Sequence, residues 1–198
     1  MKRICVFCGS SPGAKQDYLN AAALLGSLLA RKGISLVYGG GSVGVMGHLA
    51  KACLNAGGDV IGIIPRRLKE SGVAFSGLDK LYVVETMRER KAMMTEVSDG
   101  FIALPGGLGT IEEFIEVLTL AQLGMHTKPC GLLNVCGFFD KMIDFLNYAT
   151  QQRFIDNIHF NMMLIDETPE GMLKKFEDYQ APQADKIAWV VKMSEGID

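Results

Sequence analysis

The sequence predicts an α/β protein built around a parallel β-sheet. Short apolar runs alternate with longer segments of helical periodicity along the whole chain, as they do in stacked β-α-β units. The composition, with 48% hydrophobic and 21% charged residues, is that of a globular protein. A chain of 198 residues buries a sufficient core without disulfides or a structural metal, so we expect one domain over residues 1–198.

Each predicted strand is an apolar run of three to five residues. The strands are expected at Ile4–Cys8, Ile34–Tyr38, Val60–Ile64, Leu81–Val84, Phe101–Leu104, Gly131–Val135 and Met163–Ile165. The helices that fill the gaps include Asp17–Lys32, Gly44–Ala56, Thr86–Val97 and one that begins at Thr110. Gly33 is a suitable cap for the first of these helices. Arg66–Asp79 is the longest predicted loop, and the tail after about Tyr179 shows little pattern beyond the apolar patch Ile187–Val191.

Charge and hydropathy argue against two classes of partner. The formal net charge of -2 gives no basic field, so nucleic-acid binding is not indicated. The apolar run after Arg3 is too short for a signal peptide, and no later run approaches the roughly 20 residues that a membrane helix needs. We therefore expect a cytoplasmic protein with no membrane partner.

The cysteines and histidines do not form a recognisable redox or metal site. Cys5 and Cys8 have the redox spacing but lie in a predicted strand, where positions three apart face opposite sides. The odd number of five cysteines fits free thiols in apolar surroundings. His48, His126 and His159 stand in no ligand-spaced cluster, so we predict no metal site.

Two glycine-rich segments directly follow predicted strands. Gly39–Gly47 follows Ile34–Tyr38, and Pro105–Thr110 follows Phe101–Leu104. At the carboxyl end of a parallel strand, glycines let the backbone approach a ligand, and the next helix offers unpaired N–H groups and the positive end of its dipole. The two loops together predict a phosphate-binding site, with tight turns that bind nothing as the alternative.

The first loop leaves another enzyme class open. It matches the Gly-x-Gly-x-x-Gly fingerprint of dinucleotide-binding proteins, which suggests a nicotinamide-dependent enzyme. Such an enzyme needs an acid at the end of the next strand, but Arg66 and Arg67 follow that strand and Asp59 stands at its beginning. A 2′-phosphate on the arginines could rescue this interpretation, yet the second loop would stay unexplained. The P-loop pattern Gly-x-x-x-x-Gly-Lys-Ser/Thr is absent, which disfavours a P-loop NTPase.

The helix that begins at Thr110 carries an acid in an unexpected position. Residues Thr110 to Glu113 form the pattern of a capping box, and acids in a first turn suit the helix dipole. Glu113, however, falls near Val117 and Leu120 on a second apolar stripe, away from the main stripe of the helix. It would also stand beside any phosphate bound at the helix start. A carboxylate there suits a positive centre that develops beside the phosphate, so we predict a catalytic role for Glu113.

The helix Thr86–Val97 places an arginine inside its apolar stripe. Arg90 lies among the residues of this stripe, which are Met87, Met93, Met94 and Val97. Because an unpaired buried charge is costly, we expect Arg90 to have an anionic partner. The pattern leaves open whether that partner is a structural carboxylate or a ligand. Lys91 lies on the margin of the stripe.

Three segments, Gly39–Gly47, Met87–Lys91 and Pro105–Glu113, resemble the LONELY GUY (LOG) family of cytokinin riboside 5′-monophosphate phosphoribohydrolases, which are often mislabelled lysine decarboxylases. The likeness runs from Cys5 to about Tyr179, and Pro-Gly-Gly-x-Gly-Thr-x-x-Glu is its most specific element. The resemblance implies a Rossmann-like, doubly wound parallel sheet with helices on both faces. It also implies a homodimer with its sites near the interface, where the second apolar stripe of the Thr110 helix could meet the partner.

The resemblance further implies which residues form the site. Arg90 and Glu113 are the implied catalytic residues. Contacts with a nucleoside monophosphate are expected from Ser10, Gly40, Gly41, Ser42, Gly44, Met87, Lys91, Gly106, Gly107, Gly109 and Thr110. A pyridoxal-dependent decarboxylase would need a Schiff-base lysine, and the sequence singles none out. We therefore expect no cofactor.

These observations lead to a hypothesis of hydrolysis at a ribose. The enzyme would cleave the N-glycosidic bond of AMP or N6-substituted AMP, giving free base and ribose 5-phosphate through an oxocarbenium-like state at C1′. Glu113 would stabilise C1′ or position the water, and Arg90 would keep Glu113 ionised while countering the phosphate. A non-catalytic nucleotide or cofactor carrier is the alternative, because fold does not fix function. A carrier needs the glycine loops but not Arg90 together with Glu113.

Overall fold

A seven-stranded sheet forms the centre of the computed structural model, which describes residues 1–183 and 186–195. The strands are β1 (Arg3–Phe7), β2 (Ser35–Tyr38), β3 (Val60–Pro65), β4 (Lys80–Val84), β5 (Gly100–Ala103), β6 (Cys130–Leu133) and β7 (Met163–Asp166). Their order is β4-β3-β2-β1-β5-β6-β7, and every pairing is parallel. All seven predicted strands are confirmed, with bounds that shift by one or two residues.

Helices connect the strands. They are α1 (Gln16–Arg31), α2 (Gly44–Asn55), α3 (Arg66–Glu70), α4 (Met87–Val97), α5 (Leu108–Gln122), α6 (Asp140–Gln151), α7 (Asn157–Phe160), α8 (Pro169–Glu177) and α9 (Lys186–Glu195). The predicted cap of α1 is confirmed, because Gly33 follows the helix with a φ of 66° that favours glycine. No helix within the described ranges has the length and apolar character to cross a membrane.

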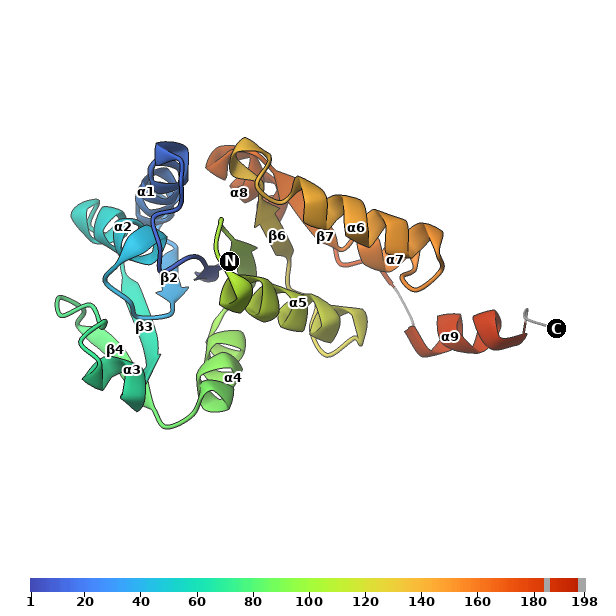
Figure 1. Cartoon of the computed structure of the whole chain (residues 1–198), viewed down its shortest axis with the longest axis horizontal. Coiled ribbons are helices and arrows are strands. Elements are labelled where there is room, and N and C mark those ends of the chain that lie inside the picture. Colours follow the sequence, from blue (N-terminus) through green and yellow to red (C-terminus); the bar gives the residue numbers. More distant parts are fainter. Residues whose placement is uncertain (184–185, 196–198) are drawn as a thin grey trace.

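The sheet carries helices on both faces, as predicted. Helices α1, α2 and α8 pack over one face, where Ile4 and Val6 point, and α4 and α5 pack over the other, where Cys5 and Phe7 point. Figure 1 shows α1 and α2 on the opposite side of β2 and β3 from α4. Cys5 and Cys8 lie on different faces of the sheet, so their thiols do not form the redox pair that their spacing suggests.

The strand order changes direction between β1 and β5. Starting from β1, the chain builds the sheet outward to β4 and then crosses back to place β5 on the other side of β1. Loops that leave the carboxyl ends of these two strands therefore diverge, and a crevice opens between them. The loops touch at their bases, where the Gly9 N–H donates to the Pro105 carbonyl at 3.1 Å.

Two predicted irregular segments contain helix. The predicted loop Arg66–Asp79 begins with α3, a short helix whose five residues are all exposed and form no apolar stripe by which it could be recognised. The apolar patch Ile187–Val191 falls in α9, which lies beyond α7 in Figure 1. Strand β6 ends earlier than predicted because Val135 enters the short 3-10 turn Val135–Gly137.

Candidate functional site

A cleft of about 300 Å³ opens at the carboxyl ends of β1, β2 and β5. Seven of the predicted site residues line it, namely Ser10, Met87, Arg90, Gly107, Gly109, Thr110 and Glu113. Residues that the sequence did not single out complete the wall, namely Val6, Phe7, Cys8, Gly9, Gly39, Met46 and Leu108. The cleft therefore joins the first turn of α5 to one buried residue of α4 and to the loop after β1.

Helix α5 begins two residues earlier than predicted. Its N-cap is Gly107, in an extended conformation and without a side-chain cap, so the predicted capping box at Thr110 is wrong. The Thr110 side chain is buried and packs where a Cβ on Gly106 would lie, which explains the glycine there. Thr110 thus serves packing at the third position of the helix instead of capping its end.

The first turn of α5 presents free donors to the cleft. Within the described ranges, no backbone carbonyl accepts a hydrogen bond from the N–H groups of Gly107, Leu108, Gly109 or Thr110. Three of these residues belong to the first turn of a helix of 15 residues, where the helix dipole also favours an anion. The geometry is that of a phosphate-binding helix start.

Arg90 and Glu113 form a buried ion pair at the floor of the cleft. Nη1 of Arg90 donates to Oε1 of Glu113, and each side chain is 9% exposed. Nε of Arg90 donates to the Ile63 carbonyl of β3 at 3.1 Å. The predicted anionic partner of Arg90 is thus a carboxylate of this chain. Both residues are buried, which the apolar stripe of α4 indicated for Arg90.

Burial and charge act in opposite directions on the carboxylate. Burial raises the pKa of Glu113 above its ordinary value, and the charge of Arg90 opposes that rise. The thiols of Cys5 and Cys8 lie near the pair, and burial raises the pKa of each. These cysteines therefore stay protonated at neutral pH and are poor nucleophiles.

Lys91 does not line the cleft but joins the same two helices. Its Nζ lies 2.5 Å from Oε1 of Glu112 and 3.1 Å from Oε2 of Glu116. Hydrogen bonding to Glu112 is the main cause that raises the pKa of Lys91. The neighbouring pairs Arg90 with Glu113 and Lys91 with Glu112 therefore tie α4 to the first half of α5.

The first glycine loop contributes less to the cleft wall than predicted. Gly40, Gly41, Ser42 and Gly44 are not among the lining residues, whereas Gly39 and Met46 are. Gly106 lines an adjoining pocket of about 250 Å³ beside Tyr18 and Phe138. Substrate contacts from these four residues of the first loop remain a prediction.

The second apolar stripe of α5 points inward. Val117 is 1% exposed and Glu113 is buried, so this stripe packs on the sheet and is not available to a partner subunit. Ile115 and Leu118, from the stripe predicted to face the sheet, line an outer pocket instead. The stripe predicted to pack on the sheet, which comprises Ile111, Phe114, Ile115, Leu118 and Ala121, is therefore confirmed only in part, because Phe114 and Ala121 are buried. The packed face combines these residues with Glu113 and Val117 of the second stripe.

The residues that a dinucleotide enzyme would need lie elsewhere. Asp59 stands at the start of β3, where both of its carboxylate oxygens accept from Lys80 Nζ, at 2.7 and 2.8 Å. Arg66 forms a bidentate contact with Glu85. The fingerprint in the first glycine loop is therefore not accompanied by an acid at the ribose position.

Comparison with known proteins gives one consistent family. A family model described as "Possible lysine decarboxylase" matches residues 46–176. The cytokinin riboside 5′-monophosphate phosphoribohydrolase LOG1 of Arabidopsis thaliana is 46% identical over 187 residues, which cover 94% of this chain and 87% of that protein. The enzyme LOG of Oryza sativa subsp. japonica, with the same activity in its name, is 44% identical over 95% of this chain and 78% of its own length.

Solved structures share the fold. The molybdenum cofactor binding protein of Rippkaea orientalis is 28% identical, with a TM-score of 0.69 over 90% of this chain and 97% of that one. The Moco carrier protein of Chlamydomonas reinhardtii is 22% identical, with a TM-score of 0.68 over 89% and 96% of the two chains. The latter likeness concerns the fold alone.

Phosphate binding by the free N–H groups of α5 can be tested at Leu108, the first residue of the helix. Leu108→Pro deletes one N–H at a position that proline tolerates, and the leucine side chain is 88% exposed. Because a hydrogen bond to a charged group contributes about 1.5–3 kcal/mol, ribose 5-phosphate should bind about tenfold or more weakly than to the matched variant Leu108→Ala. Calorimetric titration measures this difference. Equal affinities for the two variants would show that this N–H does not hold the phosphate.

Proposed function

The chain belongs to the LOG family of phosphoribohydrolases, and from this premise we propose that it hydrolyses the N-glycosidic bond of AMP or N6-substituted AMP. The products are the free base and ribose 5-phosphate. The observation that carries the proposal is the buried pair of Arg90 and Glu113, in which Glu113 lies on the same helix whose start presents four free N–H groups. Relatives named as cytokinin riboside 5′-monophosphate phosphoribohydrolases supply the substrate class.

The phosphate end of the substrate binds at the start of α5. The N–H groups of Leu108, Gly109 and Thr110 and the helix dipole attract the dianion, and Ser10 lies across the cleft. Binding energy from this remote group fixes the ribose relative to the floor of the cleft. The phosphate thus positions a bond in which it takes no part.

Glu113 acts on the ribose carbon. As the bond between C1′ and the base nitrogen breaks, positive charge develops at C1′, and the carboxylate stabilises that charge and orients water toward it. The water oxygen forms the new bond to C1′ and loses one proton, while the departing base keeps the bonding electrons and gains one proton, so that the step balances. Glu113 lies on the same helix as the phosphate donors, so the distance between the two groups is fixed by helix geometry.

Arg90 preserves the charge of Glu113. Burial alone favours the protonated acid, and the adjacent guanidinium opposes this effect. The hydrogen bond from Nε to the Ile63 carbonyl fixes the plane of the guanidinium and therefore the orientation of the carboxylate. Arg90 also brings positive charge to the side of the cleft where the phosphate binds.

A cofactor carrier is the competing proposal, since a molybdenum cofactor binding protein shares 28% identity and the fold. The hydrolases are closer in sequence, at 44% and 46% identity. Incubation with AMP and with isopentenyl-AMP, followed by chromatography of the free base, separates the two. Base release supports the hydrolase, whereas tight nucleotide binding without release supports the carrier.

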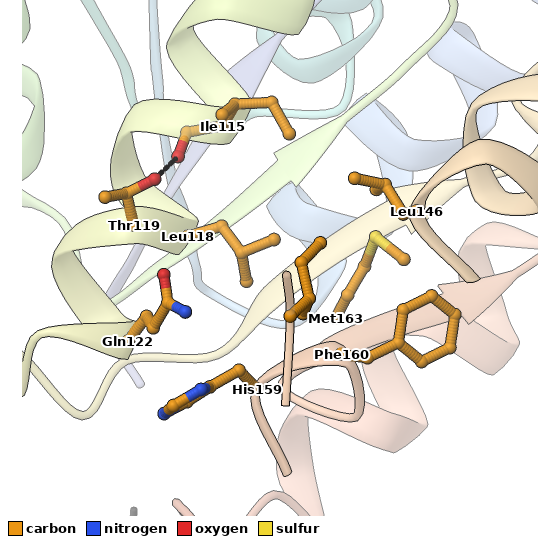
Figure 2. Close-up of a pocket in the computed structure, with 9 residues that line it drawn as sticks. Ile115, Leu118, Thr119, Gln122, Leu146, His159, Phe160 and Met163 are labelled. Atoms are coloured by element: carbon orange, nitrogen blue, oxygen red, sulfur yellow. Dashed lines mark hydrogen bonds between the residues drawn. The ribbon is translucent and has the colours of Figure 1, made fainter. Parts of the chain in front are cut away.

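We also propose that the chain acts in the cytoplasm as a homodimer. An apolar pocket of about 100 Å³ lies outside the cleft between α5, α6, α7 and β7, and Figure 2 shows Ile115, Leu118, Leu146, Phe160 and Met163 converging on it. Beside it α6 carries exposed aromatic residues, with Phe145 at 65% and Tyr148 at 57% exposure. Apolar side chains gathered on one outer face are typical of a surface that a second copy covers.

Substitution of the catalytic pair tests the mechanism. Glu113→Gln removes the charge that stabilises C1′, and kcat for AMP or isopentenyl-AMP should fall at least about 100-fold. Arg90→Ala should cause a similar loss. The matched control is Glu112→Gln, which removes an exposed carboxylate one position away and should keep activity. Retained turnover in Glu113→Gln or Arg90→Ala, with folding checked by thermal unfolding, would contradict the mechanism.

The pKa of Glu113 predicts the acid limb of the pH profile. Only the ionised carboxylate is active, and burial raises its folded-state pKa above that of an exposed glutamate. Activity should therefore be lost as pH falls, beginning at a pH above the ordinary titration range of glutamate. Steady-state kcat across pH measures the limb. A profile that stays flat down to that ordinary range would show that Glu113 does not act as a buried base.

The outer apolar face predicts the assembly state. Light scattering after size exclusion should give twice 21.5 kDa, and Phe145→Glu should shift the protein toward the monomer. Leu24→Glu is the matched control, because Leu24 is 40% exposed on α1, a helix of the other face. A dimer that is unchanged by Phe145→Glu would place the interface elsewhere.

A further inference from the structure

Three backbone N–H groups at the start of α2 and just before it donate inside the protein. Ser42 N–H donates to the Val73 carbonyl at 2.9 Å, and Met46 N–H donates to the Gly9 carbonyl at 3.2 Å. Val45 N–H points to the Ser11 carbonyl at 3.4 Å. These contacts cap the start of α2 with backbone from neighbouring loops, whereas the start of α5 has no such cap. An anion at the start of α2 would have to compete for the N–H groups of Val45 and Met46, whereas the first turn of α5 has no such competing acceptor among the described residues.

Close backbone packing explains two glycines of this loop. Gly44 has a φ of 60°, and a Cβ there would overlap the backbone of Ser10. A Cβ on Gly47 would overlap the carbonyl of Ser42. Both glycines are therefore required by the fold whether or not a ligand binds.

Gly39 is required for a different reason. It follows β2 directly and lines the cleft, and a Cβ built on it would overlap Nη2 of Arg90 and lie 3.4 Å from Cζ. The guanidinium is thus surrounded on three sides. Nε meets the Ile63 carbonyl, Nη1 meets Glu113, and Nη2 lies against the bare Cα of Gly39.

We infer that Gly39 is a positioning residue for the Arg90–Glu113 pair. The first glycine loop then serves to position this pair and does not bind the phosphate. The inference rests on the proposed function for the meaning of the pair. A side chain at position 39 would push the guanidinium from its plane, and with it the carboxylate that faces C1′. If the loop bound the phosphate, a side chain at position 39 would instead weaken substrate binding.

Kinetics of Gly39→Ala separate these two possibilities. We expect kcat to fall about 100-fold while KM for AMP and the affinity for ribose 5-phosphate stay within about threefold, because small misplacement of a reacting group costs turnover. Gly77→Ala is the matched control, since Gly77 is exposed and its Cβ would meet only the side chain of Phe75. A raised KM with unchanged kcat would overturn the inference, as would kinetics equal to those of Gly77→Ala.

A double-mutant cycle tests the contact between Gly39 and Arg90 independently of activity. Arg90→Lys removes Nη2, so Gly39→Ala should lower the unfolding temperature in the wild-type background but add little in the Arg90→Lys background. This measurement remains decisive if Gly39→Ala alone folds poorly. Equal destabilisation in both backgrounds would overturn the inference. If the wild-type protein released no base, the proposed function would fail, yet the cycle would still report whether Gly39 seats Arg90.

Discussion

The structure depends on the burial of two opposite charges beneath a phosphate-binding helix start. Arg90 and Glu113 are each 9% exposed, and an unpaired charge at that depth would be strongly destabilising. The surroundings meet this requirement in two ways: the Ile63 carbonyl accepts from Arg90, and Gly39 leaves room for the guanidinium. A costly arrangement that is held by these contacts supports the proposal that the pair serves the chemistry.

Two glycine loops that look alike in sequence have different physical tasks. The loop before α5 leaves N–H groups free at a helix start, which suits a dianion. The loop before α2 donates the N–H groups of Ser42, Val45 and Met46 to the turns that follow β1 and α3, and its glycines allow close packing. In the mechanism that we propose, one loop holds the substrate, the other supports the residues that act on it, and the reaction occurs at the ribose between them.

Apolar runs were sufficient to predict all seven strands, and helical periodicity predicted α1, α2, α4 and α5. The inner strands are buried, whereas the edge strands β4 and β7 are only partly buried. Sequence patterns gave wrong predictions for features that depend on tertiary contacts. The pattern at Thr110 fits a capping box, but the hydroxyl is buried against Gly106 and the helix starts at Leu108. The packed face of α5 combines Phe114 of the predicted stripe with Val117 of the second one, because the sheet contacts both. The pairing of Arg90 with Glu113 was expected through the family resemblance and is confirmed, whereas the place of Gly39 beside them could not be predicted from spacing, because these residues are far apart in sequence.

The central claim is that α5 holds the phosphate and thereby brings C1′ to Glu113. The most direct measurement is a crystal structure of the Glu113→Gln variant with AMP bound. The account predicts phosphate oxygens about 3 Å from the backbone nitrogens of Leu108, Gly109 and Thr110, with C1′ facing the side chain at position 113. A phosphate bound instead by the Gly39–Gly44 backbone, or a ribose turned away from position 113, would contradict it.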